Sequence, residues 1–127
     1  MSEAEKPTIS ASTVLLIRDG SDGVEVFMVV RHHEIDSFSG ALVFPGGKVD
    51  PEDADARPFC RGADDLDENT LSHQVAAIRE AFEECGVLLA RDKDSDNLIA
   101  ADQLQGIEAR WRADLTAGKI AIADVCR

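Results

Sequence analysis

Three glutamates at the end of one predicted helix have the residue type and spacing to do chemistry. Glu80, Glu83 and Glu84 occupy positions i, i+3 and i+4, and Arg79 precedes them. In an α-helix this spacing places the side chains on one face, where like charges repel one another. A divalent cation would reverse that repulsion, because Mg²⁺ and Mn²⁺ prefer hard oxygen ligands. The cluster therefore predicts a metal site. A solvated acidic helix face is the alternative, since charge runs usually mark exposed surfaces.

The element that must hold these carboxylates is a helix predicted over residues 70–85. Its apolar side chains step by four, three and four residues, which predicts one face packed on a core. They are Leu71, Val75, Ile78 and Phe82. Asn69, Thr70 or Ser72 could cap the start of the helix, and Gly86 suits the C′ position that ends it. Arg79, four residues before Glu83, can pair with that carboxylate and hold it in one rotamer.

The residues before this helix predict a β-hairpin and a third strand. Runs rich in β-branched side chains at 8–18 and 24–31 flank a turn cluster of Asp, Gly and Ser. A short apolar strand is predicted over 41–44. After the helix, residues 87–90 predict another strand. Residues 101–116 predict a second helix, whose apolar stripe, Trp111 included, is expected to pack in the core.

A glycine pair follows the strand predicted over 41–44. Glycine lets the backbone approach a ligand closely because it has no Cβ. Gly46 and Gly47 are therefore candidate cofactor-binding residues, and the Gly46 carbonyl is a candidate metal ligand. Residues 48–69 predict a long loop, and a loop of that length in a compact domain is usually functional or disordered.

Length and charge limit the classes of function that the chain can have. Its 127 residues suffice for one domain, 1–127, with a flexible tail over 1–7. Its 25 acidic and 13 basic residues give a net charge of −12. Such a charge disfavours nucleic acid and anionic membranes as partners. Three widely spaced cysteines without a zinc pattern, and an N-terminus without an apolar signal, favour a cytoplasmic location.

The motif around the glutamates resembles that of the Nudix hydrolases. Their pattern is Gly, five residues, Glu, seven residues, then Arg-Glu-U-x-Glu-Glu-x-Gly-U, where U is aliphatic. The second half matches from Arg79 to Val87, and the first half matches at Gly47, with Asp53 where the family has Glu. Residues 54–78 replace the family's seven, so the motif carries an insertion of 18 residues, with an insertion loop over 54–69. The sequence leaves open whether Asp53 reaches the helix.

The enlarged motif is similar to that of the coenzyme A diphosphatase branch, where a Phe-Pro-Gly-Gly turn leads into an Asp-rich insertion. The resemblance implies an α/β (α+β) fold, an α/β/α sandwich around a mixed sheet. It also implies Mg²⁺- or Mn²⁺-dependent hydrolysis of a nucleoside diphosphate derivative, related to coenzyme A or ADP-ribose. Glu83 and Glu84 would bind metal, Glu80 would bind metal or orient water, Gly46 would offer its carbonyl, and Arg79 would orient a carboxylate.

Nudix proteins usually continue with further strands and a final helix. The resemblance therefore implies a chain that is incomplete at its C-terminus, truncated after residue 127. Exposed strand edges would then favour pairing with a second copy as a homodimer. The alternative to a hydrolase is a catalytically weak or inactive module on the same fold, which binds nucleotides or a protein.

Overall fold

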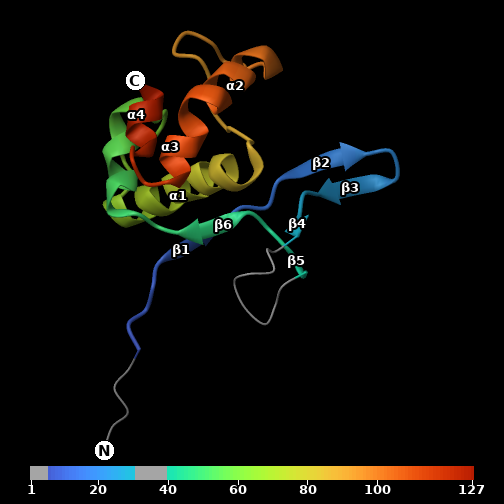
Figure 1. Cartoon of the computed structure of the whole chain (residues 1–127), viewed down its shortest axis with the longest axis horizontal. Helices are drawn as coiled ribbons and strands as arrows, with labels where there is room; N and C mark the ends of the chain where they lie inside the picture. Colours follow the sequence, from blue (N-terminus) through green and yellow to red (C-terminus); the bar gives the residue numbers. More distant parts are fainter. Residues whose placement is uncertain (1–5, 31–39) are drawn as a thin grey trace, which may run out of the picture.

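The computed structural model describes residues 6–30 and 40–127, with strands in the first part of the chain and helices in the rest (Figure 1). The strands are β1 (Ala11–Thr13), β2 (Ile17–Gly20), β3 (Gly23–Val26), β4 (Val29–Val30), β5 (Leu42–Val43) and β6 (Gly46–Lys48). The helices are the 3-10 helix η1 (Pro51–Phe59), α1 (Glu68–Cys85), α2 (Ala101–Ile107), the π-helical turn η2 (Glu108–Arg112), α3 (Ala113–Thr116) and α4 (Ile122–Cys126). The predicted mixture of α and β elements is confirmed.

The described strands form three antiparallel pairs, β1–β6, β2–β3 and β4–β5, where one mixed sheet was expected. The predicted strand over 8–18 is divided because its two ends pair with different partners. Ala11 lies opposite Lys48 in β6, whereas Ile17 lies opposite Val26 in β3. The predicted hairpin is confirmed as β2–β3, which projects away from the helices in Figure 1.

The glycine segment predicted as a turn is itself a strand. In β6, Gly46 lies opposite Thr13 and Gly47 opposite Ser12. A Cβ on Gly46 would lie closer to the Ser12 carbonyl oxygen than any side chain tolerates. The absence of a side chain therefore lets β6 approach β1, and the pair lies against α1, where the Ser12 hydroxyl donates to the His73 carbonyl at 2.6 Å.

The loop predicted over 48–69 is wrong over Pro51–Phe59, where η1 forms, and at its last two residues, which belong to α1. Pro51 supplies the fixed backbone angle that suits a first helical position. The Asp53 carboxylate accepts a hydrogen bond from the Asp50 N–H at 2.8 Å. Arg57 then donates to the carbonyls of Ala63 (2.6 Å) and Leu66 (2.8 Å), which holds the next turn in place. The insertion therefore begins inside η1, and Arg57 ties the turn that follows to this helix.

Helix α1 begins earlier than predicted, because its cap is Asp67. The Asp67 carboxylate accepts from the Thr70 N–H at 2.7 Å, which satisfies one of the free donors of the first turn. The predicted end is confirmed: Gly86 has a left-handed backbone (φ +68°), and its N–H bonds the Phe82 carbonyl.

The core lies between α1, η1 and the C-terminal helices. Its buried apolar members are Ala56, Ala63, Leu71, Val75, Phe82, Leu115, Ile122 and Ala123. Three residues of the predicted α1 stripe are thus buried, whereas Ile78 is only half-buried. No helix among the described residues combines the length and apolar character that crossing a membrane requires.

The C-terminal predictions are corrected in two places. Residues 87–90 form no strand. The nearest strand-like pairing in the described chain is a single bridge between Arg91 and Leu98. The helix predicted over 101–116 is present as α2, η2 and α3, but its middle widens into a π turn. Trp111 is half-exposed and lies outside the buried core cluster, and the Cζ atom of Arg110 lies 4.5 Å from the centre of its ring.

Candidate functional site

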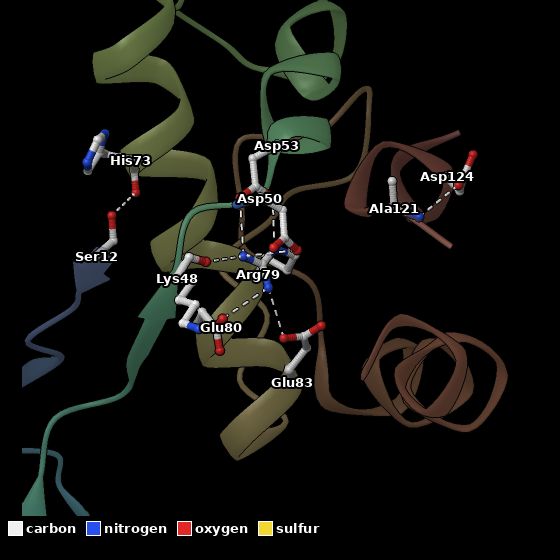
Figure 2. Close-up of polar contacts among 10 residues, drawn as sticks. All are labelled: Ser12, Lys48, Asp50, Asp53, His73, Arg79, Glu80, Glu83, Ala121 and Asp124. Atoms are coloured by element: carbon white, nitrogen blue, oxygen red, sulfur yellow. Dashed lines mark hydrogen bonds and ion pairs between the residues drawn. The ribbon is translucent and has the colours of Figure 1, made fainter. Parts of the chain in front are cut away.

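A buried arginine, Arg79, organises the candidate site (Figure 2). Its Nε donates to Asp53 Oδ1 at 2.8 Å, and its Nη2 donates to Asp53 Oδ2 at 3.2 Å. The same Nη2 donates to the Lys48 carbonyl at 2.7 Å. Paired contacts of this kind fix the plane of the guanidinium as well as its position. Asp53 therefore reaches the helix despite the insertion, because η1 directs its carboxylate back toward α1.

The third nitrogen of the Arg79 guanidinium, Nη1, bonds the glutamates of its own helix. Nη1 donates to Glu80 Oε1 at 3.1 Å and to Glu83 Oε2 at 3.0 Å. Asp50 Oδ2 lies 3.4 Å from Nη2. Arg79 thus holds both glutamate carboxylates, as the i,i+4 spacing predicted for Glu83.

Strand β6 supplies the opposite wall of the site. The Gly46 N–H donates to Glu84 Oε2 at 3.1 Å. A Cβ on Gly47 would lie too close to the Glu80 carboxylate, so any other residue at this position would displace that carboxylate. Two of the glutamates, Glu80 and Glu84, therefore lie against the two glycines of β6. Glu84 is exposed, whereas Glu80 and Glu83 are half-buried.

The site carries more negative than positive charge. Four carboxylates, from Asp50, Asp53, Glu80 and Glu83, share the single guanidinium of Arg79. Burial raises the pKa of Glu83 to about 7; Arg79 opposes this shift, and the charges of Glu80 and Asp50 add to it. Burial also raises the pKa of Glu80, again against the effect of Arg79. Burial opposes the positive charge of Arg79, but the hydrogen bond and charge of Asp53 outweigh it and raise the pKa of Arg79.

The donor set suits a hard divalent cation, although its present arrangement does not enclose one. Carboxylate oxygens are the ligands that Mg²⁺ and Mn²⁺ prefer, and the site has negative charge in excess. Within the described residues, however, no three His, Cys, Asp or Glu side chains are grouped so that they could hold a metal ion. Arg79 lies between Glu80 and Glu83, and Glu84 is bonded to β6. Glu80 and Glu83 each bond Arg79 through one carboxylate oxygen, so the second oxygen of each is the one that a cation would use.

Two open hollows flank the site. One of about 380 Å³ lies beside Arg79 and has Asp50, Asp124 and Lys119 in its lining. The other, of about 710 Å³, is bordered by Glu83 on one side and by η2 and α3 on the other. The site therefore lies between two spaces that could receive parts of a ligand.

Sequence reasoning missed two participants. The Lys48 carbonyl joins Asp50 in the Arg79 network, and Arg112 donates to the Glu83 carbonyl at 3.1 Å. The spacing between Gly47 and Asp53 gave a signal for the first, because Lys48 lies inside the first half of the motif. Arg112 had only its i,i+4 spacing from Glu108, which is common on ordinary helices.

The chain is similar to known proteins over most of its length. It is 31% identical over 83 residues to a probable nudix hydrolase of Schizosaccharomyces pombe, an alignment that covers 65% of this chain and 23% of that protein. It is 30% identical over 98 residues to the peroxisomal coenzyme A diphosphatase ndx-8 of Caenorhabditis elegans, covering 77% and 33% respectively. The crystal structure of a NUDIX hydrolase from Alicyclobacillus acidocaldarius superposes with a TM-score of 0.64 at 31% identity, covering 91% of this chain and 55% of that one.

These similarities agree with the motif and with the geometry of the site, although no family model matches the sequence. The chain belongs to the Nudix hydrolase family. The relative named as a coenzyme A diphosphatase agrees with the resemblance to that branch. The chain spans about a quarter to a third of the length of these two relatives.

Proposed function

We propose that the chain provides the catalytic motif of a divalent-metal-dependent pyrophosphohydrolase. The observation that carries the proposal is the meeting of Glu80, Glu83 and Glu84 with the glycine strand β6 around one buried arginine. This arrangement places several carboxylate oxygens beside the backbone of two glycines, where no side chain blocks the approach of a ligand. The 18-residue insertion does not disturb this arrangement, because η1 returns Asp53 to Arg79.

Each residue has a role that its position supports. Glu83 and Glu84 would bind Mg²⁺ or Mn²⁺, with Glu80 as a further ligand or as the group that orients the attacking water. The Gly46 carbonyl is a further candidate ligand. Arg79, anchored by Asp53 and Lys48, keeps Glu80 and Glu83 in place. The bound cation would neutralise diphosphate charge and lower the pKa of a bound water.

The substrate we propose is a small nucleoside diphosphate derivative, of the coenzyme A or ADP-ribose kind. A diphosphate is polyanionic, and the chain has a net charge of −12. Cations are therefore needed for the diphosphate to approach the acidic site. The enlarged motif and the relative named as a coenzyme A diphosphatase favour a coenzyme A-type substrate within this class.

A panel of coenzyme A, ADP-ribose and related diphosphates, assayed with Mg²⁺ or Mn²⁺, tests the proposal. We expect turnover that Glu83→Gln lowers by at least about a hundredfold, because loss of an outer-shell partner alone costs 10–100-fold. Glu68→Gln is the matched control, since Glu68 is an exposed carboxylate in the first turn of the same helix. Metal-independent binding of a nucleotide without turnover would instead establish the non-catalytic module. The observation that favours this second candidate is that no three metal-ligating side chains are grouped around a cation position within the described residues.

A further inference from the structure

Arg112 lies outside the motif but contacts the end of α1 that carries the glutamates. Its Nε donates to the Glu83 carbonyl at 3.1 Å, and its Nη1 pairs with Glu108 Oε1 at 2.5 Å. A Cβ on Gly86 would lie 3.2 Å from both Arg112 Nη1 and Glu108 Oε1. The Arg112–Glu108 pair therefore packs directly on the glycine that ends α1.

This contact satisfies a carbonyl that the helix cannot satisfy by itself. The last four carbonyls of an α-helix have no partner within it. The Gly86 N–H bonds the Phe82 carbonyl and the Val87 N–H bonds the Ala81 carbonyl, whereas the Glu83 carbonyl accepts from Arg112. A cation at this end also interacts favourably with the helix dipole.

The π turn η2 is the element that presents Arg112 to α1. Its five residues run from Glu108 to Arg112, so the ion pair spans the widened turn. Turns of this kind are rare and are frequently found at functional sites. Within the turn, Arg110 stacks on Trp111, whereas Arg112 is directed to the Glu83 carbonyl. The hollow of about 710 Å³ has Glu83, Glu108 and Arg112 in its lining, which makes this junction one border of the site.

We propose that Arg112 is a positioning residue that fixes the backbone from which Glu83 and Glu84 project, so that the affinity of the site for divalent metal depends on it. The inference rests on the proposed function. Arg112 bonds the backbone carbonyl of Glu83, whereas the Glu83 carboxylate is bonded by Arg79. Arg112 can therefore hold this end of α1 in place without competing with a cation for the carboxylate. Arg112 acts on the position of the two carboxylates through a single hydrogen bond, the one that it donates to the Glu83 carbonyl.

Titration of the whole chain with Mn²⁺ alone, followed by calorimetry, tests the proposal. We expect Arg112→Ala to raise the Mn²⁺ dissociation constant roughly three- to tenfold, which is below the roughly 10–100-fold typical of groups that hydrogen-bond a metal ligand directly, because the contact here is to backbone. Arg112→Lys retains one donor and the charge, and we expect an intermediate value. If Arg112→Ala does not fold, the Mn²⁺ dissociation constants of Arg112→Lys and Arg112→Gln test the proposal in its place.

Two arginines provide matched controls. Arg110→Ala removes a cation of the same π turn that is stacked on Trp111. Arg61→Ala removes hydrogen bonds to Asp92, Lys93, Ser95 and Asp96, and so lowers stability away from the glutamates. We expect both to bind Mn²⁺ like the parent chain. An Arg112→Ala protein with a lower melting temperature but the parent's dissociation constant would overturn the inference. A parent chain that takes up no Mn²⁺ would instead overturn the proposed function.

Discussion

Replacing Asp53 with Glu would install the residue that the Nudix pattern has at this position, and we expect it to destabilise the fold. Asp53 is 1% exposed, and both of its carboxylate oxygens accept hydrogen bonds. One oxygen also accepts the Asp50 N–H at 2.8 Å, which closes the first turn of η1. A longer side chain cannot keep both sets of contacts, because the backbone of η1 has placed the carboxylate at the distance that suits Asp.

The size of the effect follows from the packing. An additional methylene in a filled interior costs about 1–3 kcal/mol. The longer carboxylate would also push Arg79 from the Lys48 carbonyl, which lies only 2.7 Å from Nη2. Asp53→Ala sets the upper reference, because removing one partner of a buried ion pair costs about 3–5 kcal/mol. For a small domain with about 5–15 kcal/mol of stability, each of these losses is measurable.

Urea unfolding followed by circular dichroism and by the fluorescence of the single tryptophan, Trp111, measures the effect. With an urea dependence of about 2 kcal/mol per M, Asp53→Glu should lower the midpoint by roughly 0.5–1.5 M. Asp55→Glu makes the same chemical change at an exposed position of η1 and should stay within about 0.5 kcal/mol of the parent. If Asp53→Glu unfolds at the parent's midpoint, the reasoning about a closely fitted Asp53–Arg79 pair is refuted.

Further predictions concern the helix that carries the site and the assembly of the chain. Phe82→Ala should destabilise by about 3–5 kcal/mol in chemical denaturation, because the side chain is 0% exposed; a loss below 1 kcal/mol would contradict the assigned core. Gly86→Ala should cost about 1–2 kcal/mol, since φ is +68° there, and an unchanged midpoint would argue against this helix end. The hydrogen bond from the Thr70 N–H lowers the pKa of Asp67 below its ordinary 3.8. The ionised Asp67 cap therefore stabilises the fold above pH 3.8, and this stabilisation is lost as the pH falls through the lowered pKa. The difference in melting temperature between the parent and Asp67→Ala should therefore shrink on acidification, and a difference that grows would contradict the cap. Light scattering should detect a homodimer, because large apolar side chains of β2 to β5 are exposed; a well-behaved monomer would exclude it.

The helix and its glutamates could be predicted from the sequence because they depend on local periodicity. The 3.6-residue repeat places Leu71, Val75 and Phe82 on one side and Glu80 and Glu83 on another, whatever the rest of the chain does. The end at Gly86 is similarly local. The start was predicted less well, since several residues there are suitable caps and only the folded backbone brings the Asp67 carboxylate to the Thr70 N–H.

The positions of the strands along the chain could be predicted from the sequence, but the strands with which they pair could not. A run of β-branched residues indicates extended backbone, whereas the division of 8–18 into β1 and β2 depends on which distant strand each part meets. The loop assigned to 48–69 failed for a related reason. Asp and Pro are typical of turns, and here the same residues start a 3-10 helix whose burial depends on α1 and α4.

The sequence by itself determined that this chain carries a Nudix motif, with three glutamates on one helical face and two glycines preceding them. Only the tertiary structure decided that Asp53 pairs with Arg79 across the insertion, and that Arg112 supports the Glu83 carbonyl. The physical reason is distance along the chain. A helical face is set by backbone geometry within a few residues, whereas contacts between residues 26 or 29 positions apart depend on how the intervening segments pack.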